Sequence, residues 1–193
     1  MPAMEAFLVS AGVVALAEIG DKTQLLALVL AVRFRKPWPI IAGILISTLA
    51  NHALAGVVGR WIAATIGPTW MRWILGLSFI AMAVWTLIPD KSPDADAQRF
   101  RLGPFATTLI AFFLLEMGDK TQIATVALAA RYPSLLAVVA GTTVGMMLAN
   151  VPAVLLGDVA AKALPLRVVH AIAALIFLVM GIAVLFGLNL GLG

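Results

Sequence analysis

The chain has 193 residues, of which 63% are hydrophobic and 11% are charged. A water-soluble core of this size cannot enclose so much apolar surface, so the composition excludes an ordinary soluble domain and indicates a membrane protein. The formal net charge is +4, but the basic residues stand singly between apolar runs. That pattern argues against a nucleic-acid partner, and the absence of cysteine excludes disulfides and thiolate metal sites.

Six apolar segments follow one another along the chain, and each is close to the roughly 20 residues that a helix needs to cross a bilayer. The sequence therefore predicts an all-α membrane protein with six transmembrane helices, at about 6–32, 39–59, 73–88, 105–130, 135–157 and 168–188. The first segment would be about 40 Å long as one helix, which exceeds a hydrocarbon core of about 30 Å. Tilt, or a break at Gly20, would absorb the excess.

One polar heptapeptide lies inside the first segment and recurs 98 residues later, inside the fourth. It reads EIGDKTQ at 18–24 and EMGDKTQ at 116–122. Matches at the same offset continue outside the motif, as in Phe7 with Phe105, Arg33 with Arg131 and Gly59 with Gly157. We therefore expect a duplicated unit of three spans, and an odd number of crossings places the second copy upside down relative to the first.

The most polar stretch of the chain, 89–104, is predicted to be a cytoplasmic linker between the repeats at 1–88 and 105–193, which together form one transmembrane domain. Apart from the motif lysines, the loops after the first, third and fifth spans hold eight basic residues, and the opposite side holds three. By the positive-inside rule, the odd-numbered loops lie in the cytoplasm and both termini lie outside.

The two motifs place four carboxylates, those of Glu18, Asp21, Glu116 and Asp119, in apolar surroundings. Ionisable groups inside a membrane are costly and mark functional sites. Residues three apart on a helix share a face, and inverted symmetry would bring the two acidic pairs together at the bilayer centre. An all-oxygen cage of this kind suits a hard divalent cation such as Mn²⁺, Ca²⁺ or Mg²⁺.

The charges of the paired motifs do not balance. Two lysines, Lys22 and Lys120, against four acids leave about −2, which one divalent cation or two protons would neutralise. This favours a secondary transporter that exchanges a divalent cation for protons, with alternating access to a central site. In the structural alternative, each lysine makes an i,i+4 ion pair with the glutamate of its own motif, Glu18 or Glu116. Gly20 and Gly118 either allow a second helix to approach or interrupt their own.

Other polar residues are candidates for supporting roles. Gln24 and Gln122 are expected to be ligands or to hydrogen-bond neighbouring helices, whereas Thr23 and Thr121 are expected to bond their own helix backbone. Asn51 and Asn150 are candidates for contacts to the ligands. His52 is a proton relay or, as the simpler interpretation, a packing histidine with satisfied hydrogen bonds, and His170, which aligns with Arg72, is expected at the membrane interface.

The duplicated E-x-G-D-K-T motif in a six-span chain resembles the bacterial manganese exporters related to the Golgi manganese/calcium–proton antiporters, a branch of the cation/Ca²⁺ exchanger group. The resemblance implies that Glu18, Asp21, Glu116 and Asp119 bind the cation and that the cation is Mn²⁺, or Ca²⁺, moved in exchange for H⁺. It further implies a bacterial inner (plasma) membrane location and an ion that is substrate, with no cofactor.

Three other functions use similar residues. An exporter of basic amino acids or other organic cations could hold an ammonium group among the same acids, but an ammonium does not require four of them. Intramembrane aspartyl proteases carry G-x-G-D, whereas here the position two before each glycine is glutamate. A passive channel would need a polar lining that the second, third, fifth and sixth spans do not supply. The sequence therefore favours a transporter and not an enzyme.

Overall fold

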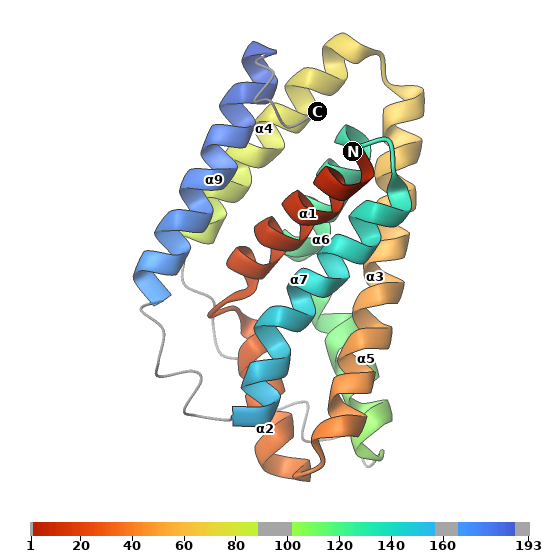
Figure 1. Cartoon of the computed structure of the whole chain (residues 1–193), viewed down its shortest axis with the longest axis vertical. Coiled ribbons are helices and arrows are strands. Elements are labelled where there is room, and N and C mark those ends of the chain that lie inside the picture. The colour runs from red at the N-terminus through yellow and green to blue at the C-terminus, as the bar shows by residue number, and fades with distance from the viewer. Residues whose placement is uncertain (1, 89–101, 157–165, 188–193) are drawn as a thin grey trace.

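The computed structural model describes residues 2–88, 102–156 and 166–187, and these residues form eight helices and no strands (Figure 1). The helices are α1 (Pro2–Glu18), α2 (Lys22–Phe34), α3 (Pro37–Thr65), α4 (Pro68–Thr86), α5 (Pro104–Glu116), α6 (Lys120–Arg131), α7 (Leu135–Leu156) and α9 (Leu166–Phe186). The all-helical class is thus confirmed. Most of the predicted linker, and most of the loop predicted between the fifth and sixth spans, lie outside the described residues.

Within the described ranges, three helices are long and apolar enough to cross a membrane: Pro37–Thr65, Leu135–Leu156 and Arg167–Phe186. A fourth span results if α1 and α2, which are bent by 71° at a short break, are taken together. The break predicted at Gly20 is therefore present, and a single tilted helix is excluded. The third predicted span begins earlier than expected, because Pro68 starts α4 at a position where proline is well tolerated.

Both copies of the motif interrupt a helix in the same way. Gly20 has φ 83° and Gly118 has φ 77°, a left-handed conformation that glycine adopts without steric cost. The backbone N–H freed by each break is bonded by the side chain four residues later. Gly20 N donates to Gln24 Oε1 at 2.9 Å, and Gly118 N donates to Gln122 Oε1 at 2.7 Å. These bonds satisfy the N–H groups of a non-helical backbone, as the interior of a membrane protein requires.

Close helix packing also recurs at the offset of the repeat. Gly43 on α3 lies against α5, where an added Cβ would be 2.9 Å from Phe105 O, and its counterpart Gly141 on α7 lies closer still to Phe7 O on α1. Small residues at these positions let two backbones approach, as is common in membrane helix pairs. The two broken helices are therefore each held against one long helix in the same register.

Helices α4 and α9 pack against each other along one side of the molecule (Figure 1). Their contact is tight, since a Cβ added at Gly181 would lie 2.8 Å from Gly76 O and 2.7 Å from Ile80 Cγ1. The pair packs on α1 and α6, whereas contacts of α9 with α2 and of α4 with α5 are few or absent. Consistently, one buried apolar cluster joins α4 and α9 to α1 and α6, and a second cluster contains residues of α2, α3, α5 and α7 alone.

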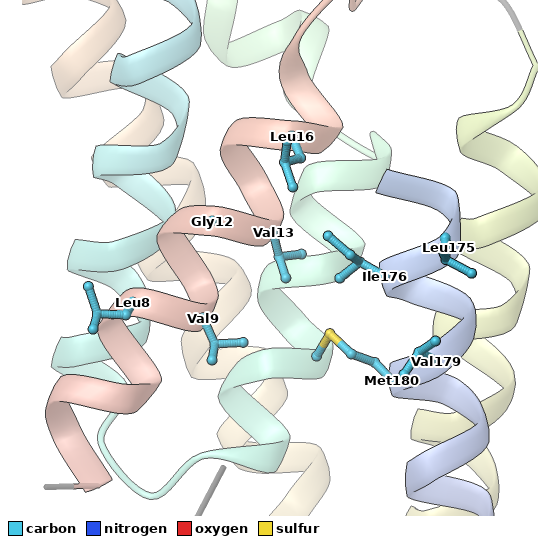
Figure 2. Close-up of a pocket in the computed structure, with 9 residues that line it drawn as sticks. All are labelled: Leu8, Val9, Gly12, Val13, Leu16, Leu175, Ile176, Val179 and Met180. Atoms are coloured by element: carbon cyan, nitrogen blue, oxygen red, sulfur yellow. The ribbon is translucent and has the colours of Figure 1, made fainter. Parts of the chain in front are cut away.

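The contact between α1 and α9 is loose by comparison. A cavity of about 440 Å³ lies between them, and Figure 2 shows side chains of both helices facing it. An added Cβ at Gly12 would meet nothing within 4 Å. The lining is entirely apolar, so the cavity is no ion site; it is formed by Leu8, Val9, Gly12, Val13, Leu16, Leu175, Ile176, Val179 and Met180.

Candidate functional site

The two helix breaks bring all four motif acids into the protein interior. Glu18 ends α1 and Glu116 ends α5, while Asp21 and Asp119 immediately precede α2 and α6. None of the four is more than 1% exposed. The prediction that Glu18 and Asp21 share one face of a continuous helix is wrong, because the left-handed glycine between them ends one helix and starts another.

The lysines join the two motifs. Lys22 Nζ lies 2.7 Å from Asp119 Oδ1, and Lys120 forms the reciprocal ion pair with Asp21. The intrahelical pairs that the spacing permits would need Glu18 and Lys22, or Glu116 and Lys120, on one unbroken helix. Since both helices are interrupted, that structural interpretation is wrong. The ion pairs cross from one half of the chain to the other instead.

The glutamates differ from the aspartates and from each other. Glu116 accepts hydrogen bonds from Thr48 Oγ1 at 3.3 Å and from Asn51 Nδ2 at 3.4 Å. Both carboxylate oxygens of Glu18 are buried without a hydrogen-bond donor among the described residues. Glu18 is also repelled by the charges of Asp21, Glu116 and Asp119, so the four acids act on one another electrostatically.

The two glutamines fix the surroundings of the breaks. Gln24 Nε2 donates to Ala149 O at 3.0 Å, and Gln122 Nε2 donates to Asn51 Oδ1 at 2.8 Å. Positions 51 and 149 are 98 residues apart, so the two bonds are equivalent in the repeat. Of the two roles expected for these glutamines, the structure shows hydrogen bonding between helices, with the amide oxygen of each already bound to its own glycine.

The asparagines, in contrast, do not play equivalent roles. Asn51 contacts Glu116 and Gln122, as expected for a residue that supports the ligands. Asn150 donates to the backbone oxygen and Sδ of Met146, at 3.1 and 3.0 Å, and its own Oδ1 has no partner among the described residues. At the offset of 98, Met146 and Ala149 replace the donors Thr48 and Asn51. Glu18 therefore lacks the hydrogen bonds that Glu116 has.

The remaining expectations are met only in part. Thr23 Oγ1 lies 3.5 Å from Asp21 Oδ2, and Thr121 Oγ1 is buried without a partner among the described residues, so neither hydroxyl is seen bonding its helix backbone. His52 is fully buried, but neither ring nitrogen has a hydrogen-bond partner in the described chain, so the satisfied packing role is wrong. His170 is not merely interfacial, since its Nε2 lies 2.9 Å from Ile19 O at the first break.

The acids are close without forming a finished metal site. Within 2–88, 102–156 and 166–187, no three acidic or histidine side chains are near enough together to share a metal ion. Both aspartates are engaged by lysines. The ion pairs neutralise the aspartates, and two further carboxylates, Glu18 and Glu116, remain beside them. The arrangement is therefore a buried acidic centre with an excess of two carboxylates over lysines.

Comparisons with known proteins place the chain in a family of transporters. The model of the divalent cation/proton antiporter GDT1 family matches residues 6–94 and 104–190. A Vibrio cholerae protein named "Putative manganese exporter" is 51% identical over 184 residues, which cover 95% of this chain and 92% of that protein. "GDT1-like protein 5" of Arabidopsis thaliana is 29% identical over 217 residues, covering 93% and 94% of the two chains.

A GDT1-like protein of Synechocystis is 29% identical over 202 residues, covering 90% of this chain and 93% of its own. No solved structure matches the chain. The family match extends over both halves and includes both motifs, which excludes the protease interpretation. The chain therefore belongs to the GDT1 family of divalent cation/proton antiporters and is a membrane transporter, not an enzyme.

Proposed function

We propose that the protein exports a divalent cation, Mn²⁺ in the first place and Ca²⁺ as a second substrate, in exchange for protons. The observation that carries this proposal is the crossed pairing of the motifs. Lys22 and Lys120 neutralise Asp119 and Asp21, so the negative charges of the two glutamates, Glu18 and Glu116, are left without a lysine partner. One divalent ion or two protons balance these charges, and exchanging one for the other leaves the membrane interior neutral.

The manganese preference rests on the relatives and on ligand chemistry. The site offers carboxylate, amide and hydroxyl oxygens, which suit Mn²⁺, Ca²⁺ and Mg²⁺. The Vibrio cholerae relative carries the name "Putative manganese exporter". We propose that the ion is held by Glu18 and Glu116 together with Asp21 and Asp119, and that the lysines withdraw from the aspartates when it binds.

We further propose that the chain crosses the membrane six times, as two inverted repeats. Equivalent elements run in opposite directions in Figure 1: α1 and α2 descend while α5 and α6 rise, α3 rises while α7 descends, and α4 descends while α9 rises. The described ends of the spans support one part of the predicted topology, that the first helix begins and the last helix ends on the side opposite the loop after the first span (Figure 1). The end of α2 and the start of α5 lie at one end of the molecule, and the start of α1 and the end of α9 lie toward the other.

In this cycle, cytoplasmic metal ion displaces the protons from the two glutamates, and the loaded centre opens to the outside. Release of the ion there allows protons to enter and the lysines to pair again with the aspartates. The glutamine bonds to Gly20 and Gly118 keep the two broken helices in shape while the charges change. We place the protein in the bacterial inner membrane with both termini outside.

Flux measurements on the purified protein in lipid vesicles test this function. We expect Mn²⁺ to cross the membrane, faster when a pH gradient drives protons in the opposite direction, and Ca²⁺ to compete. Vesicles with the Asp119→Asn protein are the matched control and should show no flux above empty vesicles. Transport of lysine without any divalent ion would instead assign the centre to an organic cation.

A further inference from the structure

The contact between His170 and the first helix break is not explained by the ion site itself. His170 lies on α9 and its Nε2 is 2.9 Å from Ile19 O, a carbonyl that the broken helix leaves at the end of α1. A carbonyl oxygen only accepts hydrogen bonds, so Nε2 carries the hydrogen and His170 is the donor. This bond ties the outer helix pair α4–α9 to the first motif.

The break in the second motif is more exposed than the break in the first. Met117, the counterpart of Ile19, is 58% exposed, whereas Ile19 is partly buried. The counterpart of His170 in the repeat is Arg72 on α4, whose guanidinium lies near Gly187 just past the end of α9, and α4 makes little or no contact with α5. The outer helices thus cover one break and leave the other open.

This asymmetry involves whole helices as well as single residues. In the repeat, α1 corresponds to α5 and α6 to α2. The pair α4–α9 packs on α1 and α6, and among the described residues the equivalent contacts with α5 and α2 are few or absent. The repeat therefore offers two equivalent packing sites for the α4–α9 pair, one on α1 and α6 and one on α5 and α2. The pair occupies the first of them.

The α4–α9 interface is packed more tightly than the α1–α9 interface, which would allow the pair to move from one packing site to the other. Gly76 and Gly181 bring α4 and α9 into backbone contact, so the pair is suited to move as one body. Between α9 and α1, by contrast, the apolar cavity of about 440 Å³ leaves part of the interface unpacked. A loosely packed, apolar interface is cheaper to separate than a close-packed one.

We propose that His170 and Arg72 are alternating latches of the transport cycle, through which the α4–α9 pair holds one helix break at a time. In the observed arrangement His170 donates to Ile19 O. In the opposite arrangement the pair shifts to α5 and α2, and Arg72 donates to Met117 O. Both act as positioning residues, since neither is a proposed ligand. This inference rests on the inverted repeat of the proposed function.

Distance measurements between spin labels test the latches, because the chain contains no cysteine and accepts labels at chosen sites. Cysteines replacing Phe186 at the end of α9 and Leu136 at the start of α7, which are 74% and 82% exposed, report the position of the pair. We expect two distances in the wild type. His170→Ala should reduce the ratio of the observed to the opposite arrangement about fivefold, as loss of one hydrogen bond implies. Arg72→Ala should raise it.

His170→Gln is the matched control, because its side-chain amide still donates and should keep a distance distribution close to that of the wild type. A purely structural histidine would not give opposite shifts in the two alanine variants. Unchanged distances in His170→Ala, or shifts in the same direction in both variants, would overturn the proposal. The labels report the latch without any flux. Opposite shifts in a protein that moves no divalent ion would leave the latch intact and reject the proposed function, whereas flux without shifts would reject the latch alone.

Discussion

Lys120 pairs with Asp21 where both side chains are excluded from the surroundings, whereas Lys22, which pairs with Asp119, is 24% exposed. The two crossed ion pairs are equivalent in the repeat but not in burial. Removing one partner of a buried pair leaves an uncompensated charge, at a cost of about 3–5 kcal/mol. Exposure of one partner lowers that cost. Because the two pairs differ in burial, we expect the two aspartates to contribute differently to stability while both are required for transport.

Asp21→Asn is therefore expected to destabilise the protein more than Asp119→Asn, while both abolish divalent cation flux. Chemical unfolding in detergent measures the first effect, and flux into vesicles measures the second. The double variant Asp21→Asn with Lys120→Met removes both charges of the pair and should recover most of the stability without recovering transport. Equal stabilities of the two single variants, or wild-type flux in either, would contradict the assignment.

Replacing the two glutamates is expected to change the free energy of unfolding by different amounts. Glu18→Gln removes a buried carboxylate that has no hydrogen-bond donor among the described residues, so the free energy of unfolding should stay the same or rise. Glu116→Gln leaves one acceptor oxygen where two carboxylate oxygens accept from Thr48 and Asn51, so it weakens one of these bonds and should cost about 1 kcal/mol. Both should eliminate flux. A larger loss of stability for Glu18→Gln would show that Glu18 has a partner we have not identified.

Binding of the transported ion should stabilise the folded protein. At a free Mn²⁺ concentration a hundred times the dissociation constant, the gain is about 2.7 kcal/mol, which raises the midpoint of thermal unfolding. Glu18→Gln and Glu116→Gln should lose this response, and Thr65→Ala, outside the site and bonded only to its own helix, should keep it. A Mn²⁺ shift that persists in both glutamate variants would place the ion elsewhere.

The glycine contacts that set the register of the long helices give a fourth prediction. A Cβ at Gly141 would collide with the backbone of α1 at Phe7, which has no flexible side-chain end to yield. Gly141→Ala should therefore destabilise the protein by about 1–3 kcal/mol. Gly12→Ala, also on α1 but facing the cavity between α1 and α9, is the control and should lower neither stability nor flux.

Sequence alone predicted the parts of the fold that depend on local pattern. Apolar length located the helices, and the excess length of the first span suggested a break at Gly20. It could not choose between a break and a tilt, because glycine permits both and the choice depends on packing. The start of α4 at Pro68 was missed because a proline and a nearby arginine are equally compatible with a loop.

The sequence predicted which acidic residues are buried, but not which side chains pair with one another. The repeated acids pointed to Glu18, Asp21, Glu116 and Asp119; the structure buries all four, and their joint role as ligands of one ion stays a prediction. The crossed lysine pairs were missed, since an i,i+4 spacing is informative only while the helix is continuous. His170 was missed because its counterpart is arginine. The available signal was a polar residue on an apolar span of a chain with only two histidines.

The crossed ion pairs make each half of the chain electrostatically incomplete. Expressed alone, residues 1–88 would carry a lysine and an aspartate whose counter-charges are both encoded in the other half. We therefore expect the first half to be stable in the membrane only once the second half is made, because until then its lysine lacks the acid with which it pairs.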